Sequence, residues 1–91
     1  MEEKFLAALA ANREKAEKLG VRIRPLADMT QVKRLVSGSR TSDGFDRLAD
    51  LGKLALSLEA LVVDRRFTAL FSDDEANTAL DRLLAAGYQF R

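Results

Sequence analysis

The sequence has no cysteine, no histidine and a single tyrosine, residue types on which many enzymes rely for their chemistry. Without cysteine the chain has no disulfide framework, no thiolate nucleophile and no zinc–thiolate site. Without histidine, acid–base catalysis would depend on Asp, Glu, Lys or Tyr, and a carboxylate titrates near neutral pH only when it is buried or close to a like charge. We therefore expect a protein that is not an enzyme, with no catalytic residue, no cofactor and no small-molecule substrate.

Long hydrophobic runs are also absent. No segment approaches the roughly 18–20 consecutive apolar residues of a membrane-spanning helix. At the N-terminus Glu2 and Glu3 precede a short apolar run, which is the reverse of the basic start of a secretory signal. The lack of cysteine is typical of a reducing compartment. We expect a soluble, unprocessed, cytoplasmic protein that makes no contact with a membrane.

The 91 residues include only one proline, and 47% of them are hydrophobic. A chain of this length forms one domain, so we expect a single helical domain over residues 1–91. The clearest helix starts with “SDDE”, in which Ser72 and Glu75 have the spacing of a capping box. Apolar residues follow at helical spacing, and Gly87 with Tyr88 is typical of a Schellman ending.

Other segments carry helical periodicity between recognisable start and stop residues. Residues 2–19 have an apolar stripe, and shorter stripes follow along the chain. The predicted boundaries are Gly20 after the first helix, Asp28 and Gly38 around the second, Ser42 or Asp43 and Gly52 around the third, Ser57 before “LEALVV”, and Asp64 before “RRFTALF”. The pattern predicts an all-α or mainly α fold, a compact orthogonal bundle of about five helices.

One segment departs from this periodicity. “VRIRP” at residues 21–25 alternates apolar and basic side chains, which is the pattern of a half-buried extended segment. A lone strand needs a partner, and “KLAL” at 53–56 also alternates. The bundle is therefore expected to leave room for one short two-stranded β ribbon, formed either within the chain or with the same segment of a second copy.

Three acidic residues are candidate metal ligands. Asp43, Asp46 and Asp50 fall on one face of a predicted helix, but their spacing matches no calcium-loop signature, so we expect no metal site. Glu59 stands alone in the apolar stretch “LSLEALVV”. It is either an exposed position on a mostly buried helix or a polar group paired in the interior.

The segment “SGSRTSDG” has the glycines, hydroxyls and arginine of a phosphate cradle and precedes a predicted helix. It lacks the lysine and the spacing of a P-loop, and Asp43 would compete with a phosphate for the N–H groups at the helix start. We interpret this segment as a connector whose polar residues cap the next helix.

Charge is distributed unevenly along the chain. Residues 13–40 carry eight Lys or Arg against three acids, whereas residues 41–91 carry six against nine. A basic middle and an acidic C-terminal half are typical of binding to an anionic partner, or of two copies that meet head to tail. The candidate contacts for an anionic partner or nucleic acid are Arg22, Arg24, Lys33, Arg34 and Arg40.

Two partial resemblances bear on nucleic-acid binding. “VRIRP” followed by a helix and then “SGSRTSDGFDRLADL” is similar in element order to ribbon–helix–helix regulators, which implies that Arg22 and Arg24 face the major groove of DNA. “RLADLGKLALSLEALV” looks like the closing half of a repressor-type helix-turn-helix domain. Each covers less than half of the chain and contains no specific motif, so we assign the chain to no family.

Apolar residues are dense between residues 54 and 71 for so short a chain. If the core cannot cover all of them, self-association has to bury the remainder. The candidate self-association residues are Val21, Ile23, Leu58, Val62 and Phe67. The sequence thus predicts a non-catalytic binding module that acts through protein–protein interaction, as a homodimer or with another protein. A DNA-binding transcriptional regulator that uses the basic region 22–40 is the alternative.

Overall fold

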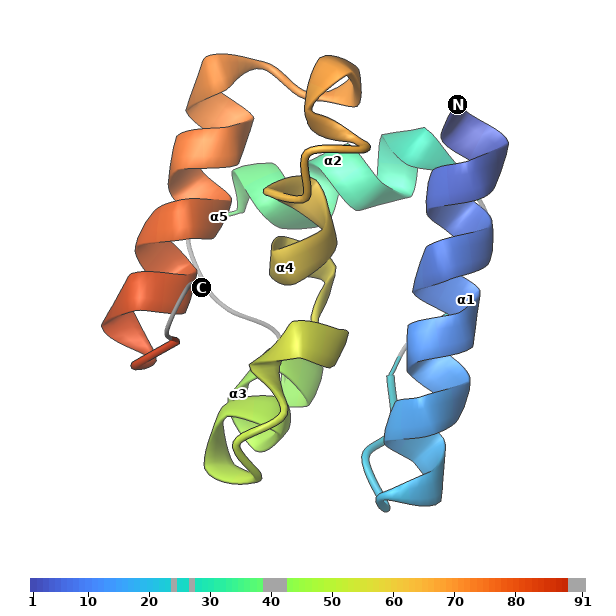
Figure 1. Cartoon of the computed structure of the whole chain (residues 1–91), viewed down its shortest axis with the longest axis vertical. Coiled ribbons are helices and arrows are strands. Elements are labelled where there is room, and N and C mark those ends of the chain that lie inside the picture. Colours follow the sequence, from blue (N-terminus) through green and yellow to red (C-terminus); the bar gives the residue numbers. More distant parts are fainter. Residues whose placement is uncertain (24, 27, 39–42, 89–91) are drawn as a thin grey trace.

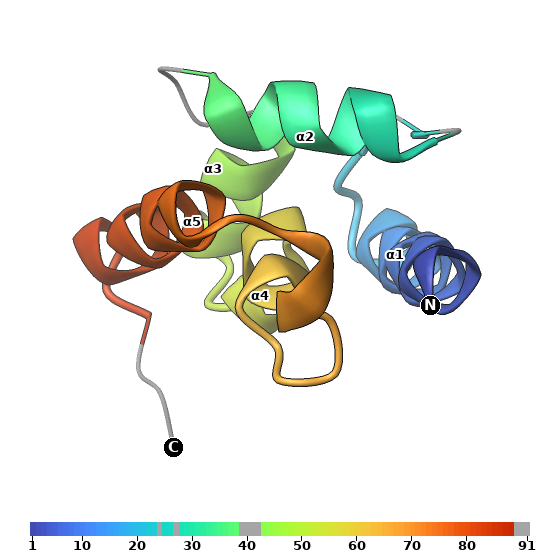
Figure 2. The ribbon, with the colours of Figure 1, turned by 90° about the horizontal axis from the view of Figure 1, so that it is seen from above.

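A computed structural model of the chain describes residues 1–23, 25–26, 28–38 and 43–88. Within these residues the fold has five α-helices, and two 3-10 helices (η1 and η2) lie between the later ones. Figure 1 shows α1 and α5 on opposite sides with α3 and α4 between them, and Figure 2 shows α2 lying across this layer. The all-α class is therefore confirmed. The elements are α1 (Glu2–Lys18), α2 (Met29–Ser37), α3 (Asp43–Asp50), η1 (Leu54–Leu56), α4 (Leu58–Val62), η2 (Thr68–Leu70) and α5 (Asp73–Ala85).

The ends of α5 follow the local chemistry of the sequence. The Ser72 hydroxyl accepts a hydrogen bond from the backbone N–H of Glu75 (3.1 Å), and the Glu75 carboxylate accepts one from the N–H of Ser72 (2.8 Å). At the other end Gly87 has a φ of +85°, which a residue with a Cβ rarely adopts, and the N–H of Tyr88 donates to the carbonyl of Leu83 (2.9 Å). The predicted capping box and Schellman ending are both confirmed.

Replacing Ser72 with alanine is expected to lower the free energy of unfolding by about 1 kcal/mol, because the backbone N–H of Glu75 at the start of α5 loses the hydroxyl that accepts its hydrogen bond. In a domain of this size that corresponds to a fall in Tm of roughly 4–8 °C. Thermal unfolding followed by circular dichroism measures it. Ser37→Ala is the matched control, since Ser37 is exposed at the end of α2; equal effects of the two variants would contradict the capping argument.

The short β ribbon predicted within the chain is not found among the described residues, and its pairing with a second copy stays a prediction. None of the described residues forms a strand, and residues 54–56 form η1 instead. The alternation of burial is present, since Leu54 is buried and Ala55 is exposed, but the backbone bonds locally. The N–H groups of Leu56 and Ser57 donate to carbonyls three residues earlier. Six residues (51–56) lie between the end of α3 and the Ser57 cap of α4, and local turns satisfy backbone groups of this segment without a partner strand.

The segment after α4 also differs from its prediction. Asp64 accepts a hydrogen bond from the N–H of Arg66 (2.9 Å), so it closes a turn, and only Thr68–Leu70 is helical within “RRFTALF”. Phe67 and Phe71 flank this 3-10 turn and both are buried. The segment therefore contributes apolar side chains to the interior and not a further α-helix.

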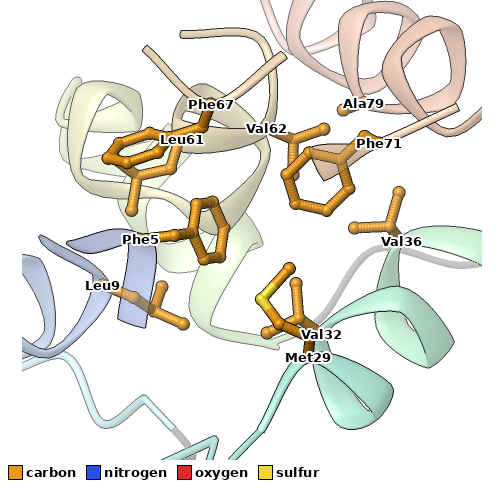
Figure 3. Close-up of a cluster of buried hydrophobic side chains, with 10 residues drawn as sticks. All are labelled: Phe5, Leu9, Met29, Val32, Val36, Leu61, Val62, Phe67, Phe71 and Ala79. Carbon is orange, nitrogen blue, oxygen red and sulfur yellow. The ribbon is translucent and has the colours of Figure 1, made fainter. Parts of the chain in front are cut away.

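Ten buried side chains from α1, α2, α4, α5 and the region of η2 form the larger part of the core (Figure 3). Phe5 of α1 lies at its centre, with its ring 5.2 Å from that of Phe67 and 5.3 Å from that of Phe71, both edge-on. A second cluster lies among the C-terminal part of α1, α3, η1 and α5, and it comprises Ala16, Val21, Phe45, Leu48, Leu54 and Leu83. The two clusters leave an apolar cleft on the inner side of α1.

Candidate functional site: an apolar cleft beside helix α1

The cleft is lined by residues of α1, of the segment that follows α1, of α3, η1 and the start of α4, and by Leu35 of α2. Its volume is about 340 Å³. Leu6, Leu9, Ala10 and Arg13 project from one face of α1, because positions three and four apart share a helix face. The other apolar side chains that line it are Ile23, Pro25, Leu26, Leu35, Phe45, Leu48, Leu56 and Leu58. For a chain of this size it is a substantial internal space, and it falls within the range of pockets that hold small ligands.

Gly44, near the start of α3, sets the distance between α3 and the segment after α1. A Cβ on Gly44 would lie 3.2 Å from the side chain of Ile23 and 3.7 Å from the carbonyl of Arg22. Both of these residues border the cleft. Glycine thus lets the backbone of α3 approach this segment closely, and the approach shapes one wall of the cleft.

Two buried polar side chains border the cleft, and the protein satisfies both. The Ser57 hydroxyl donates to the carbonyl of Leu54 (2.6 Å) and accepts from the N–H of Ala60 (3.1 Å), which is the predicted cap of α4. Glu59 is only 4% exposed, and its carboxylate oxygen lies 3.4 Å from a guanidinium nitrogen of Arg82. Of the two alternatives for Glu59, the structure shows the paired interior group.

Arg82 of α5 joins three elements. Its guanidinium donates to Glu59 of α4, to the carbonyl of Leu35 in α2 (3.1 Å) and to the carbonyl of Gly38 just beyond α2. The last carbonyls of a helix have no partner within the helix, and a cation there is favourable. Arg82 therefore caps α2 from a distance while it neutralises Glu59.

The pKa of Glu59 is raised above its ordinary range. The main cause is burial, which disfavours the carboxylate form, and the charge of Asp46 adds to it slightly. A hydrogen bond from the backbone of Glu59 itself and the charge of Arg82 act in the opposite direction. Burial outweighs them. Sequence reasoning missed the role of Arg82, although a lone arginine beside Ala79 and Leu83 on the apolar side of α5 was a signal complementary to Glu59.

Two arginines border the cleft. Arg13 is half-buried and pairs with Glu17 one turn later on the surface of α1 (3.5 Å). Arg22 is exposed, and the described part of the chain gives it no ion-pair partner. Exposed bordering residues such as Arg22 and Ala10 lie where the cleft meets solvent. The opening of the cleft is therefore basic.

The structure describes three of the five basic residues that are predicted to contact an anionic partner. Arg22 borders the cleft, whereas Lys33 and Arg34 are exposed on α2, where Lys33 lies 3.9 Å from the carboxylate of Glu75. Arg24 and Arg40 lie outside the described residues, as do residues 39–42, which are half of the connector “SGSRTSDG”. Binding of DNA by this region stays an untested prediction.

The structure divides the five predicted self-association residues into two groups. Val21, Val62 and Phe67 are buried within the chain itself, with at most 3% exposed surface. Ile23 and Leu58 are half-buried and border the cleft. A partner could therefore reach the second group through the cleft, whereas the first group belongs to the core of the single chain.

The acidic residues predicted not to bind metal are found mainly at the surface. Asp46 and Asp50 are exposed on α3, and the side chain of Asp43 lies outside the description. Throughout the described ranges, no three acidic side chains come close enough to hold a metal ion. Within the same ranges, no helix has the length and apolar character needed to cross a membrane.

Comparison with known proteins gives no assignment. No protein-family model matches the chain, and no curated protein or solved structure is significantly similar to it.

Proposed function

We propose that the protein is a non-catalytic binding module and that the cleft beside α1 holds an apolar side chain of a protein partner. The observation that supports this proposal is the cleft itself, a largely apolar space of about 340 Å³ beside the two core clusters. Ile23 and Leu58, which the sequence marks for self-association, both border it.

A binding role is also supported by the state of the polar groups in the cleft. The Ser57 hydroxyl is engaged as donor and as acceptor, and no histidine is present to activate it. Glu59 is held by Arg82. A nucleophile or general base has to be available to a substrate, and both of these groups are committed to the fold.

Charge complementarity favours a second copy of the chain as the partner. On α5, Leu84 is 55% exposed, and Asp81, almost one turn earlier, is exposed as well. Residues three apart lie on the same helix face, so a leucine and a carboxylate are presented together. Leu84 of one copy would enter the cleft of the other while Asp81 faces Arg13 or Arg22, and reciprocal insertion would close a two-fold dimer.

Sedimentation equilibrium tests this proposal. The wild-type protein is expected to dimerise at micromolar concentration and to dissociate as salt is added, because exposed charges attract less at high ionic strength. Ala10→Trp should give a monomer, since Ala10 borders the opening of the cleft and a large ring there fills it. Ala11→Trp is the matched control, because Ala11 is also exposed on α1 but does not border the cleft.

A second pair of variants tests the inserted residue. Leu84→Glu should abolish dimerisation, whereas Leu51→Glu should leave it unchanged, because Leu51 is 50% exposed but lies at the end of α3. A wild-type protein that stays monomeric at high micromolar concentration would overturn the second-copy proposal. Loss of the dimer in Leu51→Glu but not in Leu84→Glu would overturn the assigned contact.

A further inference from the structure

The cleft has the features of a small-molecule site as well as of a docking site. It is lined mainly by leucine side chains and Phe45, and its volume lies near the lower end of the range for ligand pockets. Such sites hold a ligand by apolar contact and orient it with a few polar groups. The placement of the polar groups in this cleft therefore determines the chemistry of the ligand, or guest, that the cleft can hold.

The guest has to be apolar over most of its length. Inside the cleft, the Ser57 hydroxyl is hydrogen-bonded to backbone groups and Glu59 is paired with Arg82. A polar group on the body of a guest would be taken out of water without a free partner, which costs about 1–3 kcal/mol. An unbranched alkyl chain along Leu6, Leu9 and Leu58 has no such cost.

The guest also carries a negative charge at one end. Arg22 and Arg13 border the cleft, Arg13 with its guanidinium 3.5 Å from the carboxylate of Glu17 on the surface, and among the described lining residues the one carboxylate, that of Glu59, is paired with Arg82. The charge facing a guest is therefore positive at the opening. Guanidinium groups bind carboxylates through two parallel hydrogen bonds, a geometry that an exposed arginine such as Arg22 can adopt.

We propose that the cleft binds a free single-chain amphipathic carboxylate of the medium-chain fatty acid type, with its alkyl chain against the leucines of α1 and α4 and its carboxylate at Arg22 and Arg13. This inference rests on the same cleft as the proposed function and deepens it. A bound carboxylate occupies the space that the partner's leucine needs, so the ligand releases the partner. The chain would then be a binding module whose association responds to a fatty acid.

The test is a titration with octanoate, followed by isothermal calorimetry and by NMR shifts of the backbone amides, at a protein concentration at which sedimentation shows a monomer. Octanoate is expected to bind at least about tenfold more tightly than octylamine, which has the same chain and the opposite charge. Changing Arg13 and Arg22 together to glutamine should weaken binding about tenfold, the equivalent of about 1.4 kcal/mol. The matched control changes Lys15 and Lys18 to glutamine, because both are exposed on α1 away from the cleft.

Two outcomes would overturn the inference: equal binding of octanoate and octylamine, or octanoate binding that survives Ala10→Trp. Shifts spread over the whole surface, without concentration on residues that border the cleft, would overturn it as well. These results are separate from the proposed function. A wild-type dimer that Ala10→Trp dissociates would uphold the partner site even if octanoate does not bind, and octanoate binding to a permanent monomer would uphold the ligand site alone.

Discussion

Replacing Arg82 with methionine is expected to lower the free energy of unfolding at neutral pH by about 3–5 kcal/mol, because the buried carboxylate of Glu59 then loses its countercharge. The side chains of Arg82 and Glu59 are only 11% and 5% exposed, so water cannot take the place of the guanidinium. The carbonyls of Leu35 and Gly38 lose a donor in the same variant. Urea unfolding followed by circular dichroism measures the change.

A matched control separates this burial effect from the loss of an arginine as such. Arg66 forms an ion pair with Asp64 (3.0 Å) at the surface, where water screens the charges, so Arg66→Met should change stability little. The double variant Glu59→Met, Arg82→Met should recover most of the loss, since buried ion pairs are commonly replaced by apolar side chains at little cost. A double variant as unstable as Arg82→Met would contradict the electrostatic explanation.

The loss in Arg82→Met is also expected to depend on pH. Because the pKa of Glu59 is raised in the folded protein, the folded state binds more protons than the unfolded state between the unfolded and the folded pKa. The contribution of Glu59 to the free energy of unfolding is therefore fully present below the unfolded pKa and falls as pH rises through the folded pKa. Removing Arg82 takes away a cause that lowers the folded pKa of Glu59. The pH range in which the folded state binds more protons than the unfolded state therefore extends to higher pH.

Measured against the wild type at each pH, the penalty of Arg82→Met should be largest at neutral pH and shrink on acidification, as Glu59 becomes protonated in both proteins. Urea midpoints across the acidic range test this, with Glu59→Met, Arg82→Met as the reference that has no titrating group at residue 59. A penalty that stays constant between neutral and acidic pH would mean that Arg82 acts through its packing and its carbonyl contacts alone.

The helix ends could be predicted from the sequence because they depend on neighbouring residues. Ser72 and Glu75 satisfy each other's backbone N–H groups within one turn, and Gly87 with Tyr88 closes the same helix by local bonds. Nothing distant is needed to form these motifs, so spacing and residue type suffice. The same holds for Asp28 and Ser57 as caps.

The cleft and the ion pair could not be predicted in this way, because they depend on how the helices pack. Glu59 and Arg82 lie 23 positions apart and meet only when α4 and α5 are side by side. Apolar residues in the dense stretch looked alike in the sequence, yet Phe67 is in the core whereas Leu58 borders the cleft. The strand expected at 53–56 is absent for a local reason. Gly52 ends the turn after α3 and Ser57 caps α4, and the short segment between them forms a 3-10 turn.

Truncating Phe5 to alanine is expected to lower the free energy of unfolding by about 3–5 kcal/mol, the range for loss of a fully buried phenylalanine. Its ring contacts those of Phe67 and Phe71, so its removal leaves a cavity where α1 meets the later helices. Because a chain of 91 residues is stabilised by roughly 5–14 kcal/mol, this variant should melt far below the wild type. Urea unfolding measures the loss, with Phe5→Leu as a milder variant that stays folded.

Leu6→Ala is the informative comparison for Phe5→Ala. Leu6 is half-buried and borders the cleft, so its truncation enlarges a space that already exists and should cost clearly less than the truncation of Phe5. The two neighbouring residues of α1 would then have separate roles, with Phe5 packing the helix against the core and Leu6 lining the cleft. Equal losses in the two variants would mean that the cleft closes in solution and that its leucines are part of the core.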